Sequence, residues 1–249
     1  MCFITLMYKV VPGHAVVLAA NRDEFLDRPS LPPHRLGEGV WGGQDARAGG
    51  TWLGVGAGGR VVAITNILSR PAPVPGARSR GLLCLDLLKL PPHRDCQGVL
   101  ESYVLEHRYS EFNLLLAEEG AAWVATYNGG ELGIAELSSG IHFVGNGLPE
   151  EHSDPKVQRA GKLIHPPLDI HEALGTLMAA CRDHGSGNDR DAGTTTGPDA
   201  LCVHGERHGT VSSTIIALRD GLFARSLYFF ADGNPCQREY HDLSGMLGK

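Results

Sequence analysis

The sequence lacks the patterns that mark several common protein classes. No apolar window reaches the length of a membrane span, and the N-terminus has neither the basic start nor the long apolar segment of a secretory signal. The net charge of −6 and the pI near 6.0 also leave no basic excess for binding nucleic acid or an acidic membrane. We therefore expect a cytoplasmic protein with no membrane span and no nucleic-acid partner.

Cysteine is present, but not in a recognisable framework. The six cysteines are scattered and contain no C-x-x-C pair, so neither a disulfide scaffold nor a common structural zinc motif is expected. Cys181-Arg-Asp-His184 and Cys202-Val-His204 alone come close to ligand spacing, and both flank a polar loop. We assign no metal site and no required cofactor from the sequence.

The composition and the order of apolar patterns predict one globular domain over residues 1–249. The hydrophobic fraction of 42% and the charged fraction of 20% are typical of a globular protein with a large core. Strand-like runs cluster into hairpins, helical patterns lie in separate blocks, and no βαβ alternation, internal repeat or linker is visible. We expect an α+β fold with two stacked antiparallel sheets and helices outside them.

The predicted elements follow from apolar periodicity and turn residues. Strands are expected at Cys2–Val11, His14–Asn21, Thr51–Val55, Arg60–Asn66, Phe112–Ala117, Ala121–Tyr127, Glu131–Glu136, Gly140–Gly145, Val211–Leu218 and Leu222–Phe230. Helices are expected at Gly81–Leu90, Asp95–His107, Pro155–Ile164 and Ile170–Asp183. Proline, glycine and polar residues predict long loops, which would build any substrate pocket, at Arg28–Gly50, Ser69–Arg80 and His184–Pro198.

The first hairpin carries the most informative residues. Cys2 follows the initiator methionine, and a small residue in that place normally allows the methionine to be removed. Cys2 would then carry a nucleophilic thiol and an α-amine whose usual pKa, about 7.7–8.0, suits a general base. The hairpin turn at Pro12-Gly13 would bring Cys2 to the same end as Asn21-Arg22-Asp23-Glu24. This is the chemistry of an N-terminal-nucleophile (Ntn) hydrolase.

Several ordered motifs extend this interpretation along nearly the whole chain. They are Cys2, Asn21-Arg22-Asp23-Glu24, Gly49-Gly50-Thr51-Trp52-Leu53-Gly54, Thr65-Asn66, Ser79-Arg80-Gly81, Phe112-Asn113-Leu114 and Asp154-Pro155-Lys156-Val157. In this order the chain resembles the NRDE-motif family, which is related to the transport and Golgi organisation protein 2 group. The resemblance implies a four-layer αββα fold of the Ntn-hydrolase type, closest to bile-salt hydrolase and penicillin acylase.

The resemblance also implies roles for individual residues. By similarity to cysteine hydrolases of this fold, Cys2 would be the nucleophile and Asp23 would hold its amine or thiol. Asn66 would face the same site, and Asn146 would donate to the oxyanion. Those hydrolases usually carry an arginine where this chain has Ala20, for which Arg22 is the nearest substitute, and members of the resembled family often carry an arginine where this chain has Val211. Substrate contacts are assigned to a further set of residues: Asn21, Glu24 and Trp52.

Each of these residues also has a structural interpretation. Cys2 would be a small buried apolar residue, and Asp23 would brace the hairpin. Arg22 and Glu24 would form an exposed ion pair of little energetic value, and Trp52 would belong to the core. Asn66 and Asn146 would satisfy turns, which asparagine favours.

Two functions follow from these interpretations. The first is hydrolysis or transfer of an acyl group at an amide or related bond of a small molecule. The alternative is a non-catalytic protein that retains the fold and binds or transports haem, lipid or acyl-CoA, as has been discussed for the resembled family. The sequence contains no C-x-x-C-H haem-attachment motif. The oligomeric state is left open.

Overall fold

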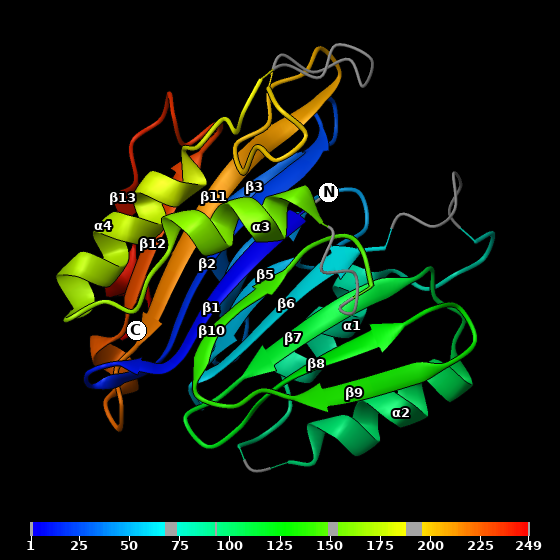
Figure 1. The fold of residues 1–249 in the computed structure, drawn as a ribbon. Helices are drawn as coiled ribbons and strands as arrows, with labels where there is room; N and C mark the ends of the chain where they lie inside the picture. Colours follow the sequence, from blue (N-terminus) through cyan, green and yellow to red (C-terminus); the bar gives the residue numbers. More distant parts are fainter. Residues whose placement is uncertain (1, 68–73, 93, 149–153, 188–195, 249) are drawn as a thin grey trace. The chain divides into compact units, whose positions relative to one another are not determined.

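The computed structural model describes residues 2–67, 74–92, 94–148, 154–187 and 196–248, which form two compact units. Unit 1 comprises Met1–Arg28, Ser138–Gly145 and Pro149–Lys249, and unit 2 comprises Pro29–Leu137 and Asn146–Leu148. Each unit consists of one antiparallel sheet with two α-helices (Figure 1). Within the described part of the chain, no helix is both long and apolar enough to cross a membrane.

Unit 1 is built on a sheet with the strand order β10-β1-β2-β11-β12-β13. Its strands are β1 (Cys2–Val11), β2 (His14–Phe25), β10 (Gly140–Val144), β11 (His208–Leu218), β12 (Leu227–Asp232) and β13 (His241–Asp242). Short 3-10 helices occupy Phe223–Arg225 and Ser244–Met246. The central strands β1, β2 and β11 are buried over most of their length, which explains their nearly continuous apolar runs.

Helices α3 (Pro155–Leu163) and α4 (Ile170–Cys181) cover one face of this sheet (Figure 1). Their buried positions are largely small, and they pack against one stripe of sheet side chains that includes Met7, Val17 and Ile215. Small residues let the helix backbone approach the sheet closely. Because side chains alternate along a strand, this packing defines the odd-numbered residues of β2 up to Asp23 as the helix-facing set.

Unit 2 is built on a sheet with the strand order β3-β4-β5-β6-β7-β8-β9. Its strands are β3 (Ser30–Gly37), β4 (Val40–Asp45), β5 (Leu53–Gly56), β6 (Arg60–Asn66), β7 (Phe112–Ala117), β8 (Ala122–Tyr127) and β9 (Leu132–Glu136). Helices α1 (Arg80–Leu88) and α2 (Cys96–Glu106) bury Leu83, Leu87 and Leu100 against one face. Arg60 links helix and sheet, since its buried guanidinium donates to the carbonyls of Leu87 and Leu90, both at 3.0 Å.

Two glycine-containing motifs of the sequence meet in unit 2. The backbone N–H of Thr51 donates to the carbonyl of Gly81, at the start of α1, over 3.0 Å. A Cβ on Gly50 would overlap the backbone of Gly81 and Leu82. Gly50 therefore permits α1 to begin directly against the segment that enters β5.

The predicted α+β class with two antiparallel sheets and flanking helices is confirmed, as are all four predicted helices to within a few residues. The predicted loop over Arg28–Gly50 is wrong, because it contains the strand pair β3 and β4. Of the predicted loops Ser69–Arg80 and His184–Pro198, residues 69–73 and 188–195 lie outside the described residues. The single domain over residues 1–249 stays a prediction.

Replacement of Gly50 by alanine should destabilise the protein. The added methyl group has no space beside the Gly81 backbone, so we expect Gly50→Ala to lower the free energy of unfolding by about 1–3 kcal/mol. Urea denaturation followed by circular dichroism measures this change. Gly120→Ala is the matched control, because a Cβ there meets no atom within 4 Å. Equal stability of the two variants would contradict the contact.

Candidate active site

The candidate active site is at the paired ends of β1 and β2 in unit 1. In the antiparallel register Cys2 lies opposite Arg22, and Phe3 lies opposite Asn21. The predicted meeting of Cys2 and the Asn21–Glu24 run at one end of the hairpin is therefore confirmed for the backbone. The side chain of Cys2 lies outside the described residues, so its contacts with Asp23 and Asn146 stay predictions.

Alternation along β2 divides the predicted residues between two faces of the sheet. Asn21 and Asp23 belong to the face that packs on α3 and α4, because both bond to atoms of those helices or of the segment after them. Arg22 belongs to the opposite face and lies between Cys2 of β1 and Ser212 of β11 in register. Arg22 is only 4% exposed, so it is not the solvated surface cation of the structural interpretation.

Asp23 is a buried carboxylate with two identified partners. It is 1% exposed, and its Oδ1 accepts a hydrogen bond from the Thr210 hydroxyl at 2.6 Å. Its Oδ2 lies 3.0 Å from Nζ of Lys156 on α3. A buried charge is costly unless it is paired and hydrogen-bonded, and these two partners provide both. Asp23 thus joins β2 to β11 and to α3.

Local sequence explains why Lys156 reaches this carboxylate. The Asp154 side chain caps α3 by accepting from the Lys156 N–H at 2.8 Å, and Pro155 occupies the first turn, where its missing N–H costs nothing. This start places Lys156 in the first turn of the helix, on its buried side.

The other two residues of the run, Asn21 and Glu24, also have identified partners, distant in the sequence for Asn21 and close for Glu24. Asn21 donates through Nδ2 to the carbonyls of Cys181, at 2.9 Å, and Leu201, at 2.8 Å. Its Oδ1 is buried and has no hydrogen-bond partner among the residues that the structure describes. Oε2 of Glu24 lies 3.8 Å from Nε of Arg28, and Oε1 of Glu24 accepts a hydrogen bond from the Phe25 N–H. Asn21 therefore ties β2 to the segments after α4, and a substrate role for either residue stays a prediction.

Three further predicted residues belong to unit 2. Asn146 donates through Nδ2 to the backbone carbonyl of Asn66 at 2.7 Å, so these two positions lie together. Asn113 supports them by donating to the carbonyl of Gly147 at 2.8 Å. The ring of Trp52 covers Gly43, where a Cβ would collide with it. The oxyanion role of Asn146, the catalytic role of Asn66 and the substrate role of Trp52 stay predictions.

The site analysis from sequence left out three residues: Lys156, Thr210 and Asn113. Two of them lie in motifs that carried the family resemblance, Asp154-Pro155-Lys156-Val157 and Phe112-Asn113-Leu114. The motifs signalled their importance, but only the fold shows which partners they bind. Thr210 precedes a bulge in β11, since Thr210 pairs with Asp23 and Ser212 pairs with Arg22. Val211, the position at which the motif resemblance implied an arginine, is the extra residue of this bulge.

The ion pair between Asp23 and Lys156 should contribute strongly to stability. Lys156→Met removes the cation and leaves a buried carboxylate without its charge partner, which should cost about 3–5 kcal/mol in the free energy of unfolding. Adding Asp23→Asn to that variant should recover part of the loss, because no uncompensated charge then remains. Chemical denaturation of the single and double variants measures the coupling. Lys162→Met, at an exposed position of the same helix, is the control. If Lys162→Met lowered the free energy of unfolding as much as Lys156→Met does, the stabilising role of the Asp23–Lys156 pair would be refuted.

Comparison with solved structures identifies the fold. A variant of conjugated bile acid hydrolase from Clostridium perfringens matches the whole chain and 94% of its own chain, with a TM-score of 0.54 and 11% sequence identity. The chain therefore has the α+β fold of the Ntn hydrolases, as the motif resemblance implied. At this identity the likeness shows the fold alone.

Comparison with protein families identifies the relatives. The Mus musculus Transport and Golgi organization 2 homolog is 33% identical over 169 residues, and the Homo sapiens homolog has the same identity over the same length. These matches include 60% of this chain and 58% of each relative, so the chain aligns with little more than half of their length. The family model described as Transport and Golgi organisation 2 matches residues 1–222. The chain belongs to the Transport and Golgi organisation 2 family.

Proposed function

We propose that this chain is an N-terminal cysteine hydrolase or acyltransferase that acts on an amide or related acyl bond. The observation that carries the proposal is the β1–β2 register, in which Cys2 lies opposite the buried Arg22 and beside the Asn21–Asp23 segment. An Ntn-hydrolase fold presents an N-terminal nucleophile from a central strand, and Cys2 begins β1 of this chain. The similarity to a conjugated bile acid hydrolase supports amide hydrolysis as the reaction class.

The proposed reaction uses both groups of Cys2. The thiol sulfur bonds to the acyl carbon while the thiol proton passes to the α-amine, and the carbonyl oxygen becomes an oxyanion. The resulting ammonium then protonates the leaving nitrogen as its bond to carbon breaks, which leaves a thioester on Cys2. Water, or another acyl acceptor, then attacks the thioester carbon while its proton passes to the amine. The carbon–sulfur bond breaks, and the thiolate takes the proton from the ammonium, which regenerates the thiol and the free amine.

Charged neighbours supply the electrostatic part of the proposal. Arg22, next to Cys2 in the register, would stabilise the thiolate and the developing oxyanion, because a nearby cation favours the anionic form of a thiol. Asp23 would orient the α-amine from its position beside Arg22. Lys156 and Thr210 hold Asp23 in place and act as positioning residues, since both bind its carboxylate directly.

The first test is the chemical identity of the N-terminus. We expect the intact mass of the purified protein to lack Met1, and 2-cyanobenzothiazole, which condenses with a free 1,2-aminothiol, to label one site that Cys2→Ala abolishes. Turnover of amide and thioester substrates should disappear in the same variant while the circular dichroism spectrum stays unchanged.

Retention of Met1 would block the amine and refute the hydrolase proposal. Retention of Met1 would favour the alternative of a non-catalytic protein that binds haem, lipid or acyl-CoA. The presence of Ala20 and Val211 at positions where the resemblance implied arginines supports the same alternative. Haem and acyl-CoA titrations would then be the next measurements, with a Soret shift as the signal for haem.

Removal of the Arg22 charge should slow the reaction of Cys2 with alkylating agents near neutral pH. Without the guanidinium, thiolate formation requires a higher pH, so the iodoacetamide rate profile of Arg22→Gln should shift upward while that of Arg22→Lys shifts less. Peptide mass spectrometry separates Cys2 from other thiols. Burial raises the pKa of Cys84, Cys96 and Cys181, the last to about 11, so these thiols should react slowly. An unchanged Cys2 profile in Arg22→Gln would show that Arg22 does not act on the thiol.

A further inference from the structure

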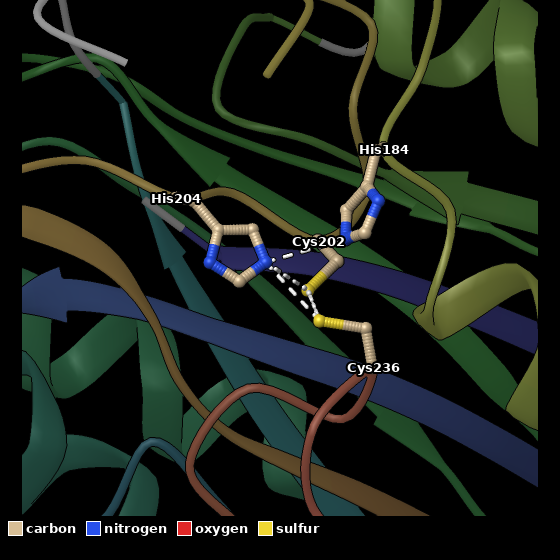
Figure 2. Close-up of side chains that lie close together, drawn as sticks. All are labelled: His184, Cys202, His204 and Cys236. Carbon is tan, nitrogen blue, oxygen red and sulfur yellow. Dashed lines mark hydrogen bonds between the residues drawn. The ribbon is translucent and has the colours of Figure 1, made fainter. Parts of the chain in front are cut away.

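Four side chains of the kinds that bind metal ions converge in unit 1, and none of them is among the residues assigned to catalysis. They are His184, Cys202, His204 and Cys236, and each can direct one ligand atom to a common point (Figure 2). All four ligand atoms lie within 4.8 Å of one another. The residues come from three segments: the segment after α4, the segment before β11 and the segment after β12.

Four of the six distances between the ligand atoms are close to the edges of a zinc-sized tetrahedron, and the other two, from His184 to the two sulfur atoms, are no longer than 4.8 Å. The two sulfur atoms, of Cys202 and Cys236, are 3.6 Å apart, and the Nε2 atoms of His184 and His204 are 3.2 Å apart. Nε2 of His204 lies 3.1 Å from the Cys236 sulfur and 3.7 Å from the Cys202 sulfur. Tetrahedral zinc, with bonds of about 2.3 Å to sulfur and 2.0–2.1 Å to nitrogen, requires edges of about 3.8 Å between sulfurs, 3.3 Å between nitrogens and 3.6 Å for mixed pairs.

Hydrogen bonding alone does not account for this arrangement. Nε2 of His204 lies within contact distance of both sulfurs and of the His184 ring nitrogen. A neutral imidazole nitrogen carries either one proton or one lone pair, so it satisfies only one of these three neighbours. A disulfide is a second alternative, but the sulfur separation of 3.6 Å exceeds the bond length of about 2.05 Å, and both thiols are free.

Other hydrogen bonds hold the three segments together independently of the four ligand side chains. The N–H groups of Leu201 and Cys202 donate to the carbonyl of Asp183, at 3.1 and 2.8 Å, which places Cys202 beside His184. Arg182 donates through Nε to the carbonyl of Pro235 at 3.0 Å, which holds the Cys236 segment against the end of α4. The ligand set is therefore preorganised by the fold.

We propose that His184, Cys202, His204 and Cys236 form a structural zinc site. Two thiolates and two imidazoles are a ligand set that zinc prefers, and four protein ligands complete a tetrahedron without leaving a position for water or substrate. Binding would release the two thiol protons to solvent. The proposal does not depend on Cys2 being a nucleophile.

The bound ion would stabilise the segment that supports Asp23. Val203, between two of the ligands, exchanges two hydrogen bonds with Thr210: its N–H donates to the Thr210 hydroxyl at 2.9 Å, and its carbonyl accepts from the Thr210 N–H at 2.8 Å. The same hydroxyl donates to Asp23. Zinc would thus fix the position of Thr210 through its immediate neighbour, and it would take no part in chemistry at an acyl bond.

The test is the metal content of the whole chain, purified without a polyhistidine tag under reducing conditions. We expect about one zinc ion per chain by elemental mass spectrometry. Titration of the metal-free chain with Co²⁺ should produce the intense visible bands of a tetrahedral cobalt site together with thiolate charge-transfer absorption. Cys236→Ser and His204→Gln should weaken binding by more than about 100-fold, since even changes around the ligands of a metal cost about 10–100-fold.

Two variants serve as matched controls. Cys96→Ser removes a cysteine of unit 2, and His171→Gln removes an exposed histidine of α4; both should retain zinc and the cobalt spectrum. Wild-type protein that holds no zinc and shows no tetrahedral cobalt bands would overturn the proposal, even if the ligand variants fail to fold.

Discussion

The burial of the Asp23 carboxylate is the constraint on which the rest of unit 1 depends. A carboxylate at 1% exposure requires a cation and hydrogen-bond donors, and these come from α3 and β11. Lys156 can supply the charge only if α3 begins where Asp154 and Pro155 start it. Thr210 can donate only from its place opposite Asp23, and the bulge that follows lets Ser212 lie opposite Arg22. One buried charge thus couples the capping of a helix to the register of two strands.

The same constraint connects the proposed active site to the proposed zinc site. Thr210 binds Asp23 with its hydroxyl proton and accepts from Val203 with a lone pair of the same oxygen, so the hydroxyl is used in both directions. Asn21 makes a parallel connection, from β2 to the carbonyl of Leu201. Both connections end in the segment that carries Cys202 and His204. A metal ion that orders this segment would stabilise the protein and fix the position of Asp23. Removal of the ion would therefore affect catalysis only indirectly, through Asp23.

Local patterns predicted much of the fold, and the failures have physical causes. Apolar periodicity located the helices and the first hairpin, because burial of one face imposes a period. Strand β3 was missed because Pro32 and Pro33 are typical of loops, although an edge strand such as β3 tolerates proline. Strand β4 was missed because its glycines also suggest a loop, whereas Gly43 in fact leaves space for the ring of Trp52. The sequence indicated His184, Cys202 and His204 by their near-ligand spacing, but it could not join them to Cys236, because the four ligands come from three segments that only the fold brings together.

The motifs that carried the family resemblance are best understood as pairs of contacts. The Asn-Arg-Asp-Glu run meets Lys156 of a second motif through Asp23, and Gly50 of a third motif lies against Gly81 of a fourth. Asn66 and Asn113 both contact the Asn146-Gly147 turn. These contacts account for the motifs by packing and hydrogen bonding, so family membership establishes the architecture, and the proposed chemistry rests on Cys2 and Arg22 alone. A chain that kept every such contact but retained Met1 would preserve this structure and have no free amine to move a proton. The state of the N-terminus, which none of these contacts determines, therefore decides between the proposed hydrolase and the binding alternative for this chain.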